Sequence, residues 1–249
     1  MRLSHGAEYN FGMNDYSSVD TTALDTRQTM TRADLTAWLA STHAVAASGD
    51  ARFSDDGEIG FVVPTEKPLK AAAVLILVIN RARQPTVLFT RRTAHLTDHA
   101  GQISFPGGRV EDGDRDVDHT ALRETEEETG VEASRIDIIG RIPHYTTGTG
   151  YFITPIVGWM EPPVTYRPDP TEVAECFEVP LDFLLDMQNH RVESAMYKGR
   201  MRHYYALSFE RRYIWGATAG MLVTFSRVLA AAQGLPVGAP VYAALDSGD

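Results

Sequence analysis

The strongest signal in the sequence is the stretch Arg123-Glu124-Thr125-Glu126-Glu127-Glu128-Thr129-Gly130-Val131. On an α-helix, at about 100° per residue, Glu127 and Glu128 lie on either side of Glu124, so three carboxylates share one face and Glu126 points away. Like charges at this spacing repel each other, which predicts a positive group among them. Carboxylate oxygens are the ligands that Mg²⁺ and Mn²⁺ prefer, so Glu124, Glu127 and Glu128 are candidate metal ligands.

The sequence around this stretch distinguishes a metal site from an ordinary solvated acidic face, which is the more common reason for such a run. A helical pattern covers residues 116–129, and Gly130 directly after it is typical of a helix C-cap. Upstream, Phe105-Pro106-Gly107-Gly108 predicts a sharp turn, because proline lacks an amide hydrogen and glycine tolerates unusual backbone angles. Arg123, four residues before Glu127, is placed to orient one of the carboxylates.

Strand and helix patterns continue on both sides of the acidic stretch. Residues 71–80 form an uninterrupted aliphatic run, which predicts a central strand buried on both faces. Further strands are predicted at 86–92, just before Pro106, at 136–142, at 152–160 and in a hairpin that turns at Lys198-Gly199. Helices are predicted at 32–47, capped by Thr31 with Asp34 three positions on, at 180–187 and at 217–233. This order predicts an α/β sandwich with a mixed sheet.

The chain has 249 residues with 43% hydrophobic content, enough for one substantial core. We expect a polar N-terminal arm at 1–31, one domain at 32–240 that begins with the helix at 32–47, and a tail at 241–249. The net charge of -10 argues against sequence-independent binding to nucleic acid or to an anionic membrane. The single Cys176 excludes an intramolecular disulfide or a cysteine zinc cluster and favours the reducing cytoplasm. The sequence shows neither a signal peptide nor an apolar run of spanning length, which predicts a soluble protein.

Gly107-Gly108 followed by the stretch at 123–131 resembles the Nudix box, Gly-x5-Glu-x7-Arg-Glu-U-x-Glu-Glu-x-Gly-U, in which U is aliphatic. The departures are Asp114 in place of the first Glu, a spacing of fifteen positions from Gly108 to Arg123 where the box has fourteen, and Thr125 in the first aliphatic position. The resemblance extends over residues 71–231. It implies an α/β/α sandwich with a metal-binding helix and hydrolysis of a pyrophosphate linkage with Mg²⁺ or Mn²⁺.

The coenzyme A diphosphatase branch of that family shares the longer spacing, and it carries the signature LLTxR(S/A)xxxRxxxGxVxFPGG upstream of the box. Residues 88–108 read LFTRRTAHLTDHAGQISFPGG and are similar to it, although the basic position falls on Thr97-Asp98. Arg91, Arg92, His95 and His99 are cations that could replace it. The resemblance implies that coenzyme A or an acyl-CoA is cleaved to 3′,5′-ADP and 4′-phosphopantetheine or its acyl form.

Several further residues have an expected role by the same resemblance. Glu128 is the strongest metal candidate, Glu124 is also placed to accept a proton from water, and a loop carboxylate is expected from Glu172 or, second, Glu175. Asp114 either approaches an outer metal or caps the helix.

The expected substrate contacts surround this metal site. Gly107 and Gly108 permit close approach of the substrate. Arg91 or Arg92 binds phosphate, although neighbours on a strand point to opposite faces. His144 is a candidate substrate contact, acid or base. Tyr213 and Trp215 are expected to pack in the core in preference to stacking on adenine.

Other functions stay open on the sequence. Within the family, NADH, ADP-ribose or a dinucleotide polyphosphate are alternative substrates. A non-catalytic ligand-binding relative is a second alternative, which the intact Arg123, Glu124, Glu127 and Glu128 oppose. A calcium loop starting at Asp112 is rejected, because it needs Gly at 117 and Glu at 123, where the chain has Val117 and Arg123. The polar arm and first helix could contribute to a homodimer interface.

Overall fold

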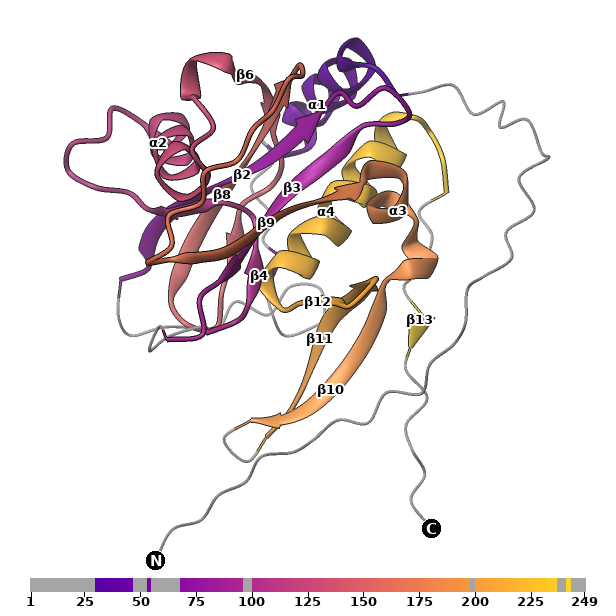
Figure 1. The fold of residues 1–249 in the computed structure, drawn as a ribbon. Coiled ribbons are helices and arrows are strands. Elements are labelled where there is room, and N and C mark those ends of the chain that lie inside the picture. Colours follow the sequence, from indigo (N-terminus) through magenta and orange to yellow (C-terminus); the bar gives the residue numbers. More distant parts are fainter. Residues whose placement is uncertain are drawn as a thin grey trace, which may run out of the picture.

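The computed structural model describes residues 30–46, 53–54, 68–95, 100–197, 200–236 and 241–242 (Figure 1). The predicted polar arm therefore lies outside the described residues except for Met30 and Thr31, and so does the tail beyond residue 242. The division of the chain into an arm, a domain and a tail stays a prediction.

Two long parallel strands form the centre of the fold. β2 (Lys70–Ile79) pairs with β8 (Tyr151–Met160) along its whole length, from Lys70 opposite Tyr151 to Ile79 opposite Met160. The last eight residues of each strand are buried. Continuous burial is expected where helices cover both faces of a sheet, and it explains why the aliphatic run shows no alternation. The strand predicted at 71–80 is confirmed with a shift of one residue.

The large sheet is mixed and has nine strands, in the order β1-β7-β8-β2-β3-β4, with β5 also on β2, β6 on β8 and β9 on β3. Its other members are β1 (Phe53–Ser54), β3 (Thr86–Arg92), β4 (Ile103–Ser104), β5 (Gly107–Arg109), β6 (Asp137–Arg141), β7 (Tyr145–Thr146) and β9 (Val173–Pro180). β2 and β3 pair only at the start of β3, around Val87. β5 pairs with the first half of β2 and β4 with the end of β3, so the chain from 103 to 109 fills the opening between the two strands.

Helices cover both faces of this sheet. They are α1 (Arg32–Ala46), α2 (Val117–Thr129), α3 (Leu181–Leu185) and α4 (Ala217–Ala232), with 3-10 turns at Ala133–Arg135 and Met187–Asn189. α2 lies alone on one face, whereas α1, α3 and α4 lie on the other (Figure 1). The predicted α/β/α sandwich with a mixed sheet is thus confirmed. None of the helices within the described ranges has the length and apolar character needed to cross a membrane.

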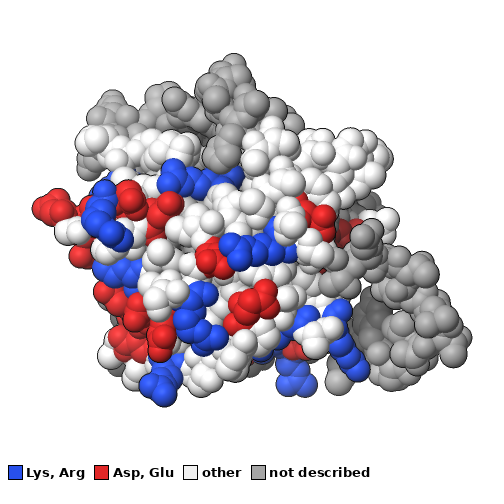
Figure 2. Space-filling model, turned by 90° about the horizontal axis from the view of Figure 1, so that it is seen from above, with Lys and Arg blue, Asp and Glu red and all other residues white. Residues whose placement is uncertain are grey.

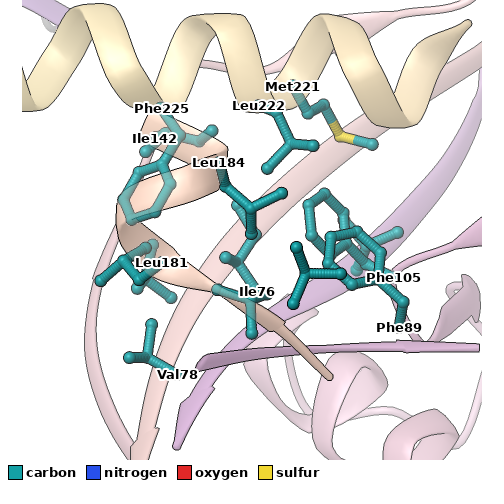
Figure 3. Close-up of a cluster of buried hydrophobic side chains, with 14 of the residues drawn as sticks. Ile76, Val78, Phe89, Phe105, Ile142, Leu181, Leu184, Met221, Leu222 and Phe225 are labelled. Carbon is teal, nitrogen blue, oxygen red and sulfur yellow. The ribbon is translucent and has the colours of Figure 1, made fainter. Parts of the chain in front are cut away.

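Each helical layer has its own hydrophobic core. Between the sheet and α3 and α4, the buried side chains include Ile76, Phe89, Leu184, Leu222 and Phe225 (Figure 3). The core beneath α2 is smaller and is formed by Leu75, Leu77, Leu88, Ala121, Ile156 and others. Alternate residues of β2 enter opposite cores, as the two-residue period of a strand requires.

A four-stranded sheet projects below the main body (Figure 1). It has the order β12-β11-β10-β13, with β10 (Arg191–Tyr197), β11 (Arg200–Phe209), β12 (Arg212–Trp215) and β13 (Val241–Tyr242). β10 and β11 pair antiparallel up to Tyr197 opposite Arg200, which confirms the predicted hairpin, although Lys198 and Gly199 lie outside the described residues.

The expectation that Tyr213 and Trp215 pack in the core is wrong, because they are 38% and 40% exposed. Ile214 between them is fully buried and faces Leu207 of β11. Neighbouring residues of a strand point to opposite faces, so burial of Ile214 turns both rings outward.

The local signals at the helix ends are confirmed. Thr31 and Asp34 form a reciprocal cap at the start of α1: the Thr31 amide donates to the Asp34 carboxylate at 3.0 Å, and the Asp34 amide donates to the Thr31 hydroxyl at 3.2 Å.

The sequence pattern does not predict β9, because Glu175 and Glu178 interrupt its apolar residues. In the fold these carboxylates pair with arginines, Glu175 with Arg91 and Arg212 and Glu178 with Arg81, so a strand containing them is tolerated.

Candidate active site

The acidic stretch lies on α2, whose two ends are fixed by local structure. The Asp116 carboxylate accepts the amide of His119 at 2.8 Å and caps the N-terminus. The alternative that Asp114 caps the helix is therefore wrong. Gly130 ends the helix in the left-handed conformation at φ 71° and ψ 13°, and its amide donates to the Glu126 carbonyl at 2.8 Å. The predicted cap at Gly130 is confirmed.

A stripe of small side chains seats α2 on the sheet. Thr120, Ala121, Thr125 and Thr129 are fully buried there. Thr125 fills the position at which the Nudix box has an aliphatic residue, and its hydroxyl donates to the Ala121 carbonyl at 2.6 Å. The hydroxyl is thereby satisfied inside the helix, so threonine serves here as a small core residue.

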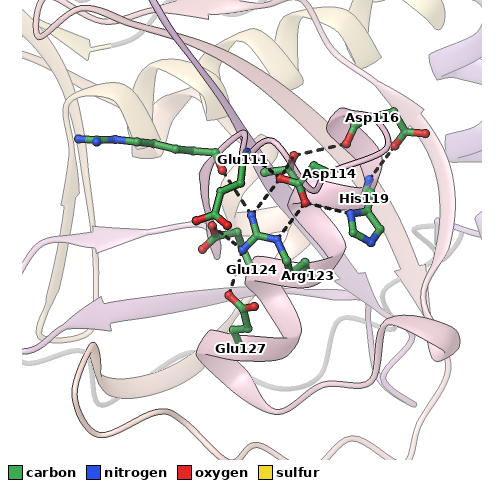
Figure 4. A network of polar contacts seen from close by, with 9 residues as sticks. Glu111, Asp114, Asp116, His119, Arg123, Glu124 and Glu127 are labelled. Atoms are coloured by element: carbon green, nitrogen blue, oxygen red, sulfur yellow. Dashed lines mark hydrogen bonds and ion pairs between the residues drawn. The ribbon is translucent and has the colours of Figure 1, made fainter.

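Asp114 holds Arg123 in place (Figure 4). The side chain of Asp114 is 1% exposed, and it accepts hydrogen bonds from Arg123 Nε at 2.9 Å and from Nη2 at 3.0 Å. It also accepts from the Thr120 hydroxyl at 2.8 Å and from the Glu111 amide at 2.9 Å. The Arg123 guanidinium, more than any other contact, holds the pKa of the Asp114 carboxyl well below its usual range. Asp114 is thus a positioning residue for Arg123, a role that neither sequence-based alternative, a metal contact or a helix cap, gave it. The sequence feature that goes with this role is a shorter acid in a box that is one residue longer.

Arg123 connects this anchor to the acidic face. Its Nη1 donates to Glu124 Oε1 and to Glu127 Oε2, each at 3.0 Å (Figure 4). A positive group was predicted among the three carboxylates, and Arg123 lies where such a group is needed. Glu127 itself is largely exposed, with 60% of its side chain accessible, whereas the Glu124 side chain is 17% exposed.

Glu128 points into the protein and is 5% exposed. Its Oε2 atom is buried and makes no hydrogen bond within the described residues. Burial first, and then the charge of Glu124, raise the pKa of the Glu128 carboxyl to about 8, against the opposing effects of Arg92 and of the Gly107 amide. An unpaired buried carboxylate is costly, so this oxygen calls for a cation.

The two glycines of the turn have different reasons to be glycine. A Cβ on Gly107, at φ 152°, would lie 2.4 Å from the carbonyl oxygen of Ala73. A Cβ on Gly108 would lie 2.4 Å from the Glu124 carboxylate. Gly107 therefore lets the backbone of β5 meet β2, whereas Gly108 leaves room for the carboxylate of Glu124.

Glu172 reaches the acidic face from the loop between β8 and β9. Its charge raises the pKa of both Glu124 and Glu128. The loop is held against the end of α2, because the Asp169 amide donates to the Glu128 carbonyl at 3.1 Å. The Thr93 amide donates to the Glu172 carbonyl at 2.8 Å, which joins the loop to the end of β3. The first candidate for the loop carboxylate thus lies near the helix.

The second candidate, Glu175, has other partners. It binds Arg91 at 3.2 Å and Arg212 at 2.5 Å. Arg91 is turned away from α2 by this contact. Arg92, its neighbour on β3, lies near enough to Glu128 to lower the pKa of that carboxyl, and the buried Nε of Arg92 makes no hydrogen bond within the described residues. Of the two candidate arginines, Arg92 faces the carboxylates.

Two of the three candidate histidines, His95 and His144, lie within the described residues. The His144 imidazole stacks on Phe152 at 4.5 Å, and its Nδ1 lies 3.2 Å from the Thr154 hydroxyl. Thr154 is paired with Ala73, which is paired with Gly108, so His144 is two strands away from that glycine. Burial lowers the pKa of His144 and favours its neutral form. His95 Nε2 lies 3.1 Å from the Thr171 carbonyl, and Thr97, Asp98 and His99 lie outside the described residues.

The donor set fits a hard divalent cation. Glu124, Glu127 and Glu128 present carboxylate oxygens on one face of α2, one of them buried and unpaired, and Glu172 lies near Glu124 and Glu128. The Arg123 guanidinium is hydrogen-bonded to the carboxylates of Glu124 and Glu127. Among the described residues, no three acidic, histidine or cysteine side chains converge in metal-ligating positions. Figure 2 shows acidic side chains gathered at the left edge of the molecule, the side on which Figure 1 places α2.

A mixed sheet between helical layers, with a turn of two glycines leading to an acidic helix that encloses Glu128, is suited to metal-dependent hydrolysis of a phosphoanhydride. The NUDIX domain model matches residues 69–198, which is more than half of the chain, so this chain belongs to the Nudix family. It is a Nudix pyrophosphohydrolase, an enzyme for nucleoside diphosphates linked to a second group, and Nudix hydrolases generally use divalent metal ions.

Curated relatives agree with this assignment. The chain is 39% identical over 153 residues to an uncharacterized Nudix hydrolase, NudL, of Escherichia coli O1:K1, with 61% of this chain and 79% of the relative covered. NudL of Shigella boydii serotype 18 shows the same identity and coverage. Among solved structures, a NUDIX hydrolase from Alicyclobacillus acidocaldarius is 17% identical with a TM-score of 0.42, and the match covers 70% of this chain and 100% of that one.

Proposed function

We propose that this enzyme hydrolyses the pyrophosphate linkage of coenzyme A or an acyl-CoA, and that it releases 3′,5′-ADP and 4′-phosphopantetheine or its acyl form. The observation that carries the proposal is the position of Glu128, whose buried, unpaired oxygen lies beside Glu124 and Glu172 and opposite Arg92. The coenzyme A signature supports the choice of substrate. Its Thr90 and Arg92 lie on β3, and its residues 105–108 lead from the end of β4 into β5, where the segment ends against Glu124 and Glu128.

We assign Glu124, Glu127 and Glu128 as the residues that would hold Mg²⁺ or Mn²⁺. A cation bound there would lower the pKa of a water molecule and neutralise charge on the phosphoryl oxygens. Arg123 positions Glu124 and Glu127, because the buried Asp114 fixes its guanidinium. Glu124 or Glu172 accepts the proton of the attacking water, since both side chains are more exposed than that of Glu128.

Arg92 binds the pyrophosphate on the side opposite α2. The buried Nε of its guanidinium has no hydrogen-bonding partner among the described residues, and a phosphate oxygen would supply one. Gly107 and Gly108 present backbone without a side chain beside the carboxylates. His144 is assigned to a more distant part of the substrate, because two strands separate it from Gly108. Arg91 lies on a different surface, where it pairs with Glu175.

The remaining features of the proposal follow from composition. The partner is a small molecule, because the chain is acidic, and a cytoplasmic location fits a protein with one cysteine. A homodimer is tested by light scattering at several protein concentrations, and a mass that stays at 27.5 kDa would exclude it.

A substrate panel tests the substrate. The purified enzyme is incubated with coenzyme A, acetyl-CoA, NADH, ADP-ribose and a dinucleotide polyphosphate, with Mg²⁺, with Mn²⁺ and with a chelator, and the products are separated. We expect the highest kcat/KM with a coenzyme A compound, products cleaved at the pyrophosphate, and no turnover with the chelator. Intact coenzyme A together with rapid cleavage of NADH would show that the substrate assignment is wrong.

A matched pair of variants on α2 tests the site. Glu128→Gln keeps the shape of the side chain and removes its charge, so kcat is expected to fall by about 100-fold or more. Glu126→Gln is the control, because Glu126 is exposed on the opposite side of the helix and, among the described residues, its carboxylate hydrogen-bonds only to the Ala133 amide, at 3.1 Å. Equal turnover of the Glu128 variant and the parent would instead support a non-catalytic ligand-binding protein.

A further inference from the structure

A second concave site lies on the other side of β3 from the acidic helix. It is a cavity of about 380 Å³ at the junction of the two sheets. Its walls include Arg91, Gly101, Arg211, Arg212, Tyr213 and Trp215. Neither the metal site nor the proposed cleavage uses these residues.

The cavity contains three guanidinium groups. Glu175 fixes two of them, because it binds Arg91 at 3.2 Å and Arg212 at 2.5 Å. Arg212 is also packed over the Phe177 ring at 4.4 Å and bound to Glu210, outside the cavity, at 2.5 Å. Arg211 is exposed and makes no ion pair within the described part of the chain. Two carboxylates, Glu175 and Glu210, pair with Arg91 and Arg212, so the third guanidinium, that of Arg211, leaves the cavity with one excess positive charge.

Two aromatic rings complete the wall. Tyr213 and Trp215 are 38% and 40% exposed, although aromatic rings are usually buried. Contacts outside the cavity hold them: Tyr213 donates its hydroxyl to Glu193, and Trp215 meets Tyr204 edge to face at 5.6 Å. Fixed, exposed rings beside guanidiniums are suited to a planar base that carries a phosphate.

We propose that this cavity binds the nucleoside end of the substrate, with the guanidiniums on a phosphomonoester of the ribose and an aromatic ring against the base. The inference rests on the proposed function, since coenzyme A carries such a phosphate at the 3′ position. Arg91 and Arg92 are consecutive on β3 and point to opposite faces, one into the cavity and one toward Glu128. A single extended substrate therefore contacts both faces by passing over the end of this strand.

Two substrates that differ by one phosphate test the site. kcat/KM is measured for coenzyme A and for 3′-dephospho-coenzyme A with the parent and with Arg211→Gln. Because Arg211 is exposed and unpaired, the variant is expected to fold like the parent, which thermal unfolding checks. We expect kcat/KM for coenzyme A to fall about 5- to 20-fold, the range for loss of one charged hydrogen bond, and that for the dephosphorylated substrate to stay within about twofold.

Two further variants sharpen the result. Arg211→Lys keeps the charge and is expected to recover most of the preference for the phosphorylated substrate. Arg83→Gln removes an equal charge from the exposed turn before β3, at the opposite end of that strand from Arg91, and is expected to change neither value. An equal loss with both substrates, or no loss in Arg211→Gln, would overturn the proposal.

Product binding separates this inference from the substrate assignment. If the parent does not cleave coenzyme A, calorimetry with 3′,5′-ADP and 5′-AMP still examines the cavity. Tighter binding of 3′,5′-ADP by the parent, lost in Arg211→Gln, would support the cavity while the proposed substrate fails. Equal affinity of the parent for the two nucleotides would overturn the cavity proposal by itself.

Discussion

At the scale of single residues, three glutamates on one helix turn have three different environments. Glu127 is solvated, Glu124 is half-buried and bonded to Arg123, and Glu128 is enclosed with an unpaired oxygen. The helical period alone places all three on one face, which is why the sequence was sufficient to select them. Their burial depends on β5, which precedes the helix, and on the loop that carries Glu172, which follows it, and only the fold brings these two segments onto the helix.

The buried charge of Glu128 predicts a pH dependence of stability in metal-free enzyme. The unfolded carboxyl has its ordinary pKa of 4.5, whereas the folded one has a pKa of about 8. Between these values the native state keeps a proton that the unfolded state has lost, so the free energy of unfolding falls as pH rises from about 5 to 8. Glu128→Gln has no such proton, and at pH 8.5 it is expected to be more stable than the parent by on the order of 1–3 kcal/mol.

Urea unfolding in the presence of a chelator, at pH 5 and pH 8.5, measures this difference. The two proteins are expected to have similar stability at pH 5 and to diverge at the higher pH. Glu126→Gln, which is exposed, should follow the parent at both values. If the difference in the free energy of unfolding between Glu128→Gln and the parent is the same at both pH values, the Glu128 carboxyl does not cause the pH dependence.

Asp114 shows at the same scale what a sequence pattern leaves open. The Nudix box has an acidic residue before the helix, and such a residue could either contact a metal or cap the helix. The fold selects neither, because the side chain is enclosed by Arg123, Thr120 and the Glu111 amide, and these contacts form only when the turn after β5 folds back on the helix.

At the scale of secondary-structure elements, the short strand β5 positions the site by passing between β2 and α2. At its first two residues, Gly107 and Gly108, the same substitution by alanine is expected to have opposite effects. Gly107→Ala places a Cβ against backbone atoms of Ala73 and Val74, at 2.4 and 2.6 Å, which cannot move without disturbing the central strand. We expect it to lower the free energy of unfolding by more than about 2 kcal/mol.

Gly108→Ala places a Cβ against the end of a flexible side chain, the carboxylate of Glu124 at 2.4 Å. That carboxylate can rotate away, so the expected loss of stability is below about 1 kcal/mol, while kcat falls about 10- to 100-fold because Glu124 leaves its position. Denaturant titration and steady-state kinetics on both variants check the contrast. Similar stability of the two proteins, or full activity of Gly108→Ala, would contradict the assignment.

Elements with a regular apolar pattern were predictable, and those stabilised by partners distant in sequence were not. β2, β3 and α4 lie within one or two residues of the positions that their hydrophobic runs indicate. β9 was missed because its acids are acceptable only beside Arg81, Arg91 and Arg212, which come from other elements. A short stretch of sequence does not show which residues of other elements will pair with its acids.

At the scale of the whole molecule, the hydrophobic core extends beyond the family match at residues 69–198. α1 precedes that match and α4 follows it, yet both contribute to the core on the face of the sheet opposite α2. Leu35 and Leu39 of α1 and Leu222 of α4 are fully buried there (α4 side in Figure 3). α1 and α4 therefore share the core of the family domain, and their contribution should be to stability.

Leu39 tests this view, because it packs from α1 beside Gly140 of β6, far from the carboxylates of α2. Leu39→Ala is expected to lower the free energy of unfolding by about 2–4 kcal/mol, through lost burial and the cavity that remains. Leu235→Ala is the matched control: Leu235 is 54% exposed after α4, so its truncation should change stability by less than about 0.5 kcal/mol. Below the unfolding transition, kcat of both variants should stay within about twofold of the parent, because neither residue lies on the face of the sheet that α2 covers. If Leu39→Ala instead unfolds like the parent, α1 is only loosely attached, and the core of the enzyme is limited to the segment that the family shares.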